Sequence, residues 1–172
     1  MIVLNLGNLF GLLGSESGQV GEIAVECRPD AIVVVCAVGD LDEGRLRQLL
    51  ESGEIVEFTY QIEHQVQRRM WFDVNLGEYQ IQKILSYNPL ARQYLARRLA
   101  VDEATEERIF PDFHEAFYWL TSLQVRLPRL PDPEPAGREY LRVRVVQQKS
   151  RFLLLIPREM STPWQKVAVK CP

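Results

Sequence analysis

The chain has 172 residues, 20 Lys and Arg against 23 Asp and Glu, a formal net charge of -3 and 47% hydrophobic residues. This balance is typical of one soluble domain, long enough to bury about 70% of the surface that its unfolded chain exposes. Charged residues make up only 25% of the chain, which argues against disorder, and no period persists that would indicate a coiled coil or a repeat array. The acidic balance argues against a general nucleic-acid binder, so we expect no nucleic-acid partner.

Residues 1–20 are expected to be a tail or the remainder of a targeting segment, ahead of a single globular domain over residues 21–172. The longest uncharged run, Met1 to Ser15, is shorter than the ~20 apolar residues that a membrane-spanning helix needs. It also lacks the Lys or Arg that opens a secretory signal. The sequence therefore predicts no membrane span and does not by itself choose between the cell envelope and the cytoplasm.

Two β-rich runs, Glu22–Cys27 and Ala31–Val38, predict a hairpin. The second run is apolar on both faces, which indicates a central strand that is covered on both sides. A short helix is expected next, with Asp40 as its N-cap, Glu43 completing a capping box and Gly53 ending it. Its narrow apolar stripe needs a surface to pack on, and the sheet is the expected one.

Alternating patterns predict most of the later elements. From Ile55 to Glu63 apolar and polar residues alternate, which is typical of a half-buried antiparallel strand. A second helix is expected to begin at Asp112 and to continue its apolar stripe as far as Leu123. Further strands are expected at Glu78–Leu85, Arg92–Leu99, Tyr140–Val146, Phe152–Ile156 and Trp164–Val169.

The Pro-rich segment at residues 128–137 reads as an extended loop within the domain, because Pro fits neither a helix interior nor a central strand. Most other connections have hairpin length, so the sheet should be largely antiparallel. The sequence therefore predicts a single α+β domain, mainly an antiparallel β-sheet or β-sandwich with two short amphipathic helices.

The three cysteines, Cys27, Cys36 and Cys171, contain no C-x-x-C pair, and the two histidines lie far from them in the sequence, which argues against a structural zinc site with its four ligands. A hairpin turning at residues 29–30 places Cys27 opposite Ile32, about 13 Å along the strand from Cys36, so these two should not bond to each other. Either could bond Cys171 in an oxidising compartment. Buried free thiols are the favoured interpretation.

No familiar catalytic, metal or cofactor motif is present. His114-Glu115 resembles half of a zinc-binding H-E-x-x-H helix, but Tyr118 stands where the second histidine would be. There is no G-x-S-x-G nucleophile motif and no glycine-rich phosphate loop. We therefore expect no metal and no cofactor, and we favour a protein that is not an enzyme. The alternatives are a hydrolase-like site that the fold assembles around Asp73 or His64, and a carrier of an apolar ligand.

The run Arg68-Arg69-Met70-Trp71-Phe72-Asp73 is the strongest candidate for a binding surface. It gathers two cations, two large aromatic residues and an acid at a predicted turn, as protein or glycan contact surfaces do. The favoured interpretation of this run alone is structural: Trp71 and Phe72 point to opposite faces of a strand and cover the core, and the arginines are solvated.

Phe117-Tyr118-Trp119 must place some aromatic area off the core face, and Arg142 and Arg144 must line one surface of the sheet. These two stripes would form an amphipathic groove if they converge with this turn, and otherwise they are a solvated outer face.

Four passages of the chain occur in a recognisable order. They are the helix-to-strand passage Leu46 to Tyr60, the turn Arg69-x-Trp71-Phe72-Asp73, the passage Leu85-Ser86-Tyr87-Asn88-Pro89-Leu90-Ala91-Arg92-Gln93-Tyr94, and the helix opening Phe110-x-x-Phe113-His114-Glu115-Ala116. Together they resemble an exported bacterial family, domain of unknown function 4390, from about Glu22 to the Trp164 segment. Members typically begin with a signal peptide, so the resemblance implies a periplasmic or envelope-associated protein. It implies no catalytic residues, because the family has no established activity.

The resulting hypothesis is a non-catalytic binding or scaffolding module of the bacterial cell envelope, whose partner is another protein. The candidate binding residues are Arg68, Arg69, Trp71, Phe72, Asp73, Arg92 and Tyr94.

Overall fold

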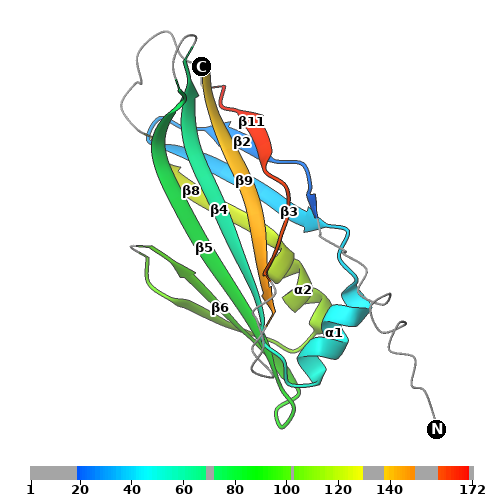
Figure 1. The fold of residues 1–172 in the computed structure, drawn as a ribbon. Helices are drawn as coiled ribbons and strands as arrows, with labels where there is room; N and C mark the ends of the chain where they lie inside the picture. Colours follow the sequence, from blue (N-terminus) through cyan, green and yellow to red (C-terminus); the bar gives the residue numbers. More distant parts are fainter. Residues whose placement is uncertain (1–18, 69–71, 102, 130–137, 150–158, 171–172) are drawn as a thin grey trace, which may run out of the picture.

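The computed structural model describes residues 19–68, 72–101, 103–129, 138–149 and 159–170 (Figure 1). Along the chain the elements are β1 (Gln19–Val20), β2 (Ala24–Cys27), β3 (Ala31–Gly39), α1 (Glu43–Glu51), β4 (Val56–Gln67), β5 (Val74–Asn88), β6 (Gln93–Ala100), β7 (Glu106–Phe110), α2 (Phe113–Thr121), β8 (Ser122–Pro128), β9 (Arg138–Lys149), β10 (Glu159–Ser161) and β11 (Gln165–Ala168). The fold is α+β and mainly β, and its strand pairs are antiparallel, which confirms the predicted fold class.

The smaller sheet is built around β3, which pairs with β2 and β8 and, at its end, with β1. Its register places Cys27 opposite Ile32, as the predicted hairpin requires. The prediction that both faces of β3 are covered is wrong in part, because the Val35 side chain is 43% exposed. The core lies against one face only, so the apolar run reflects a central strand with a partly open outer face.

The larger sheet has the strand order β10-β9-β4-β5-β6-β7, with β11 also paired to β9. Figure 1 shows β3 and β8 crossing behind β4 and β9, and the two helices near one end of the sandwich. Side chains of both sheets and both helices meet in a single hydrophobic core. The predicted alternation is confirmed in β4, where Val56, Phe58, Tyr60 and Ile62 are buried, and in β9, where Leu141, Val143 and Val145 are buried.

The helix boundaries differ from the predicted ones. The N-cap of α1 is Asp42, whose side chain accepts a hydrogen bond from the backbone N–H of Arg45 at 2.9 Å, whereas Asp40 has φ = 57° and lies outside the helix. Asp112 caps α2 as predicted. This helix ends at Thr121, however, and Leu123 is buried as a residue of β8. Leu123 satisfies the helical spacing and the strand alternation equally well, so the pattern alone placed the boundary wrongly.

The structure contains further strand residues that the sequence pattern does not predict. Two whole strands, β7 and β8, are among them. Pro128 closes the edge strand β8, a position where a missing N–H is tolerated. Gln19 and Val20, within the stretch expected to be a tail, pair with β3. The predicted loop at residues 130–137 and the predicted strand at residues 152–156 lie outside the described residues.

Candidate functional site

The outer face of the larger sheet carries a strip of polar and aromatic side chains. Successive side chains of a strand point to opposite faces, so the buried residues of β4 and β9 leave their neighbours on the face away from the core. We call this strip the Trp164 face. Its strand residues are Gln61, Glu63 and Gln65 of β4, Tyr140, Arg142 and Arg144 of β9, and Lys166 of β11; Asp73, just before β5, and Trp164, just before β11, complete it.

A bulge in the edge of the sheet places Trp164 on this face. Ser161 pairs with Val146 and Gln165 pairs with Val143, so the three residues 162–164 stand opposite only two residues of β9. Thr162 fixes the bulge: its backbone N–H donates to the carbonyl of Val145 at 2.9 Å, and its hydroxyl accepts from the Val145 N–H at 2.9 Å. Proline cannot donate to a ladder and is tolerated at bulges, so Pro163 suits this position.

Trp164 lies against two arginine side chains of the neighbouring strand. The guanidinium carbons of Arg142 and Arg144 lie 4.6 and 4.5 Å from the centroid of its ring, within the range of cation–π contacts. Arg142 also pairs with Glu63, with 3.3 Å between Nη1 and Oε2. Arg144 donates from Nε to Oε1 of Gln61 at 2.6 Å. These contacts hold one large aromatic ring and two cations in fixed positions on a solvent-facing sheet.

Tyr140 connects this face to the hairpin between β4 and β5. Its hydroxyl lies 2.5 Å from Oδ2 of Asp73 and 2.5 Å from Oε1 of Gln65. The hydroxyl has one proton, which these two acceptors share. Burial, reinforced by the hydrogen bond to Asp73, raises the pKa of Tyr140 to about 12. Nζ of Lys166 lies 3.5 Å from the centre of the Tyr140 ring. Asp73 therefore joins the described part of this hairpin to the surface that carries Arg142 and Arg144.

The predicted binding residues of this hairpin are only partly described. Arg68 is exposed, Phe72 is 95% exposed, and Asp73 is bound to Tyr140. Arg69 and Trp71 lie outside the described residues. The exposed Phe72 does not cover the core, so the favoured structural interpretation of this run is wrong for Phe72.

Arg92 and Tyr94 lie at the other end of β5, roughly 45 Å along the strand from Asp73. Arg92 is exposed in the turn after β5, with φ = 53°. Tyr94 is buried, with its ring centre 4.9 Å from that of Tyr87 and 5.5 Å from that of Phe113. The structure therefore does not bring these two residues to the surface that contains Asp73, because a long strand separates the two turns.

The interior contains a polar pair near the same end of β4 as Asp73. His64 is fully buried, and its Nε2 is hydrogen-bonded to Oε1 of Glu139. Nδ1 of His64 has no hydrogen-bond partner among the described residues. His64 and Asp73 lie on opposite faces of the sheet, so the arrangement does not join them in one hydrolase-like site. Within the described part of the chain, no three His, Cys, Asp or Glu side chains gather closely enough to hold a metal ion.

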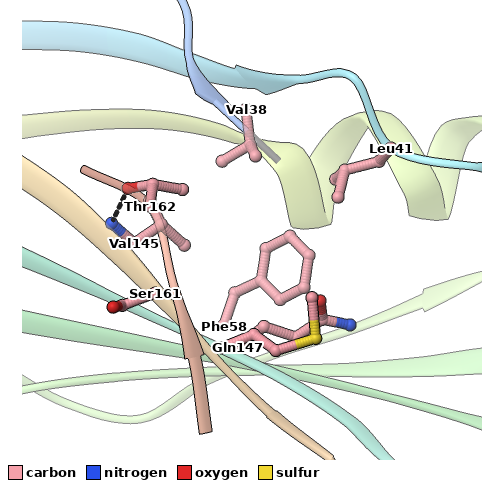
Figure 2. A pocket seen from close by; sticks show the side chains of 8 residues that line it. Val38, Leu41, Phe58, Val145, Gln147, Ser161 and Thr162 are labelled. Atoms are coloured by element: carbon pink, nitrogen blue, oxygen red, sulfur yellow. Dashed lines mark hydrogen bonds between the residues drawn. The ribbon is translucent and has the colours of Figure 1, made fainter. Parts of the chain in front are cut away.

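A small pocket lies near β10 (Figure 2). It is lined by apolar side chains including Val38, Phe58 and Val145, and Figure 2 shows the Phe58 ring in its middle. Its volume of about 10 Å³ is close to the space of one water molecule, whereas ligand pockets commonly hold ~300 Å³ or more. This pocket has no room for the apolar ligand of a carrier protein.

The described cysteines, Cys27 and Cys36, differ in whether they form a disulfide. Cys27 is disulfide-bonded, so the interpretation of all three as free thiols is wrong for this residue. Cys36 is free and buried, and burial raises the pKa of its thiol to about 11. Cys171 lies outside the described residues. The sequence could not decide the state of Cys27, because a disulfide depends on which distant segments meet.

Sequence reasoning found Asp73, Arg142 and Arg144 but missed Tyr140, Trp164 and Lys166 as members of the same face. The signal available for them was the aromatic and basic composition of the C-terminal strands. Their convergence depends on strand register and on the bulge at residues 162–164, and neither is written in a local pattern.

Comparison with known proteins gives a family but no function. Residues 16–152 match the family described as domain of unknown function, DUF4390; this range includes Arg142 and Arg144 and ends before Trp164. No curated protein and no solved structure matches the chain. Among the described residues, neither helix has the length and apolar content needed to cross a membrane. Because the match covers most of the sequence, the chain belongs to the DUF4390 family.

Proposed function

We propose that the protein is a non-catalytic binding module that contacts another protein through the Trp164 face. The observation that supports this most directly is the seating of Trp164 on Arg142 and Arg144, on the side of the sheet that faces away from the core. Trp, Tyr and Arg are the residue types most enriched at the energetic centres of protein interfaces. The Trp164 face combines all three types.

The contacts within the face support specific rather than non-specific binding of a partner. Arg142 and Arg144 are held by Glu63 and Gln61, so little side-chain freedom is lost when a partner binds. The adjoining hairpin presents Phe72, an exposed apolar residue of the kind that fills a partner's pocket. The surface thus offers an aromatic centre with a polar surround, which is the usual composition of a non-obligate interface.

We further propose that the protein works in the cell envelope. The disulfide at Cys27 supports this location, because disulfides persist in oxidising compartments such as the bacterial periplasm and are rare in the cytosol. The resemblance of the chain to an exported family supports the same location. The sequence-based binding residues Arg68, Arg69 and Trp71 belong to the same proposal, because their hairpin adjoins Asp73.

The proposal is tested by capture from envelope extracts with the tagged full chain as bait. The Trp164→Ala variant should lose a partner that the unchanged chain retains, and Trp71→Ala tests the hairpin in the same way. The matched control is Tyr118→Ala, which removes an aromatic residue that is 69% exposed on α2, away from this face. Equal recovery of every bound protein by the Trp164→Ala variant and the unchanged chain would rule out the assigned surface.

A further inference from the structure

Arg144 differs from the other arginine of the Trp164 face in its partners. Arg142 pairs with the carboxylate of Glu63, whereas the hydrogen bond of Arg144 within the described residues goes to the neutral amide oxygen of Gln61. In the described part of the chain, no carboxylate lies within ion-pair distance of Arg144, and its terminal nitrogens Nη1 and Nη2 have no hydrogen-bond partner. Toward the described residues, this partly buried guanidinium thus keeps its charge uncompensated and its terminal donors free.

The position of this guanidinium is fixed before any ligand arrives. Gln61 binds its Nε at 2.6 Å, and the ring of Trp164 lies 4.5 Å from its central carbon. A guanidinium that is anchored through Nε presents its remaining N–H groups as a planar fork, which matches the two oxygens of a carboxylate. Anchoring also lowers the entropy lost on binding, because the long side chain is already ordered.

Lys166 is a second cation of the face. Lys166 pairs in register with Arg142 across β9 and β11, and its Nζ lies over the Tyr140 ring. No carboxylate of the described residues forms an ion pair with it. The two carboxylates of the face are engaged, Glu63 by Arg142 and Asp73 by Tyr140. The face therefore carries an excess of positive charge, although the chain as a whole carries a net charge of -3.

We propose that Arg144 is a carboxylate-binding residue, which receives an Asp or Glu side chain from an acidic peptide segment of the partner, with Lys166 as a second cation. This inference rests on the proposed function and names the chemistry of the partner. A polyanion such as a nucleic acid would need a broad positive field, which the acidic balance of the chain does not provide. A single guanidinium that lies against an aromatic ring, as that of Arg144 does, favours a single carboxylate instead.

The test is an NMR titration of the isotope-labelled full chain with an acetylated, amidated peptide of alternating Glu and Ser. The signals to follow are Nε–H of Arg144 and the indole N–H of Trp164. Both should shift with this peptide, and the apparent affinity should fall about tenfold when Gln replaces each Glu in the peptide. Arg144→Gln should cause a similar loss of about tenfold, while Arg45→Gln, on the exposed side of α1, should leave the affinity unchanged.

Equal shifts with the Gln peptide, no shift at Arg144, or a larger response to inorganic phosphate would each overturn the carboxylate assignment. Failure of this inference can be separated from failure of the proposed function. If capture from extracts depends on Trp164 but is the same with Arg144→Gln, the contact face stands and its carboxylate chemistry is wrong. If the peptide binds Arg144 but no captured partner depends on Trp164, the proposed function is wrong and the carboxylate site stands.

Discussion

Nζ of Lys83 donates a hydrogen bond to the backbone carbonyl of Trp119 at 2.6 Å, from a side chain that is only 5% exposed. It also donates to the carbonyl of Ser122, and the Tyr60 hydroxyl donates to the carbonyl of Leu120 at 2.7 Å. The last carbonyls of a helix have no partner within the helix. Side chains of the larger sheet therefore satisfy the end of α2 where the chain enters β8.

The Tyr60 hydroxyl makes a specific contribution to stability. Tyr60→Phe keeps the buried ring but leaves the Leu120 carbonyl without this donor, so we expect a loss of about 1–2 kcal/mol in the free energy of unfolding. Urea denaturation followed by circular dichroism measures it. Tyr118→Phe, which changes an exposed hydroxyl nearby on α2, should cost almost nothing. Equal effects of the two substitutions would contradict the assigned hydrogen bond.

Lys83 should make stability depend on pH. Desolvation, the largest cause, and the charge of Arg98 lower the pKa of Lys83 from 10.5 to about 8. Between these two values the unfolded chain holds a proton that the folded chain has released, so stability rises with pH. The rise approaches about 1.4 kcal/mol per pH unit from this group.

The difference in unfolding free energy between the unchanged chain and Lys83→Met isolates this effect. Measured from about pH 7 to about pH 9.5, the difference should move in favour of the unchanged chain as pH increases. Comparison with Lys83→Met is needed because Cys36 acts in the opposite direction. The pKa of Cys36 is raised from 9.0 to about 11, so the stability that Cys36 contributes is lost as the pH rises between these two pKa values. A difference that stays constant with pH would show that Lys83 is not desolvated as described.

The cysteine assignment predicts thiol reactivity. The native chain should resist alkylation at Cys36, because the thiol is buried and its pKa is about 11. We predict that Cys27 pairs with Cys171, the pairing that the sequence allows in an oxidising compartment. The unfolded, unreduced chain should then show one reactive thiol, and peptide mapping should place it at Cys36. Alkylation of Cys27 without reduction would contradict the disulfide.

Tyr140 should titrate unusually late. Its pKa of about 12 is due mainly to burial and then to the hydrogen bond with Asp73. Asp73→Asn removes the carboxylate charge, so we expect the pKa of Tyr140 to fall, and the NMR shift of the ring carbon next to the hydroxyl follows it. Because the folded pKa lies above the ordinary value of 10.0, the stability from Tyr140 is complete below that pH and is lost towards 12. An unchanged titration in Asp73→Asn would contradict the contact between the hairpin and the sheet.

The strands with regular alternation could be predicted from the sequence. In β4 and β9 each second residue is apolar, and the pattern specified both the strand and its buried face. The boundary between α2 and β8 could not be predicted, because Leu123 fits both periods and the side chains that satisfy the helix end come from distant Lys83 and Tyr60.

In the Trp164 face, too, local alternation predicts some features, whereas others depend on contacts between distant segments. The sequence places Arg142 and Arg144 on one face by alternation alone, and it marks the hairpin at Asp73 as unusual. That Trp164 lies on those arginines follows from a bulge opposite Val145, which sets the register of a separate strand. Grouping Arg92 with Asp73 failed for a related reason: similar chemistry at two turns does not reveal that a strand of 15 residues separates them.

Photocrosslinking from position 164 itself tests whether the Trp164 face contacts a partner. A photoreactive phenylalanine derivative replaces Trp164 in one variant of the full chain and Tyr118 in another, and each is irradiated in the envelope extract. We expect a specific crosslinked protein from position 164 that is absent from position 118 and is displaced by an excess of unlabelled, unchanged chain. No specific product from position 164, or the same product from both positions, would contradict the claim that this face contacts a partner.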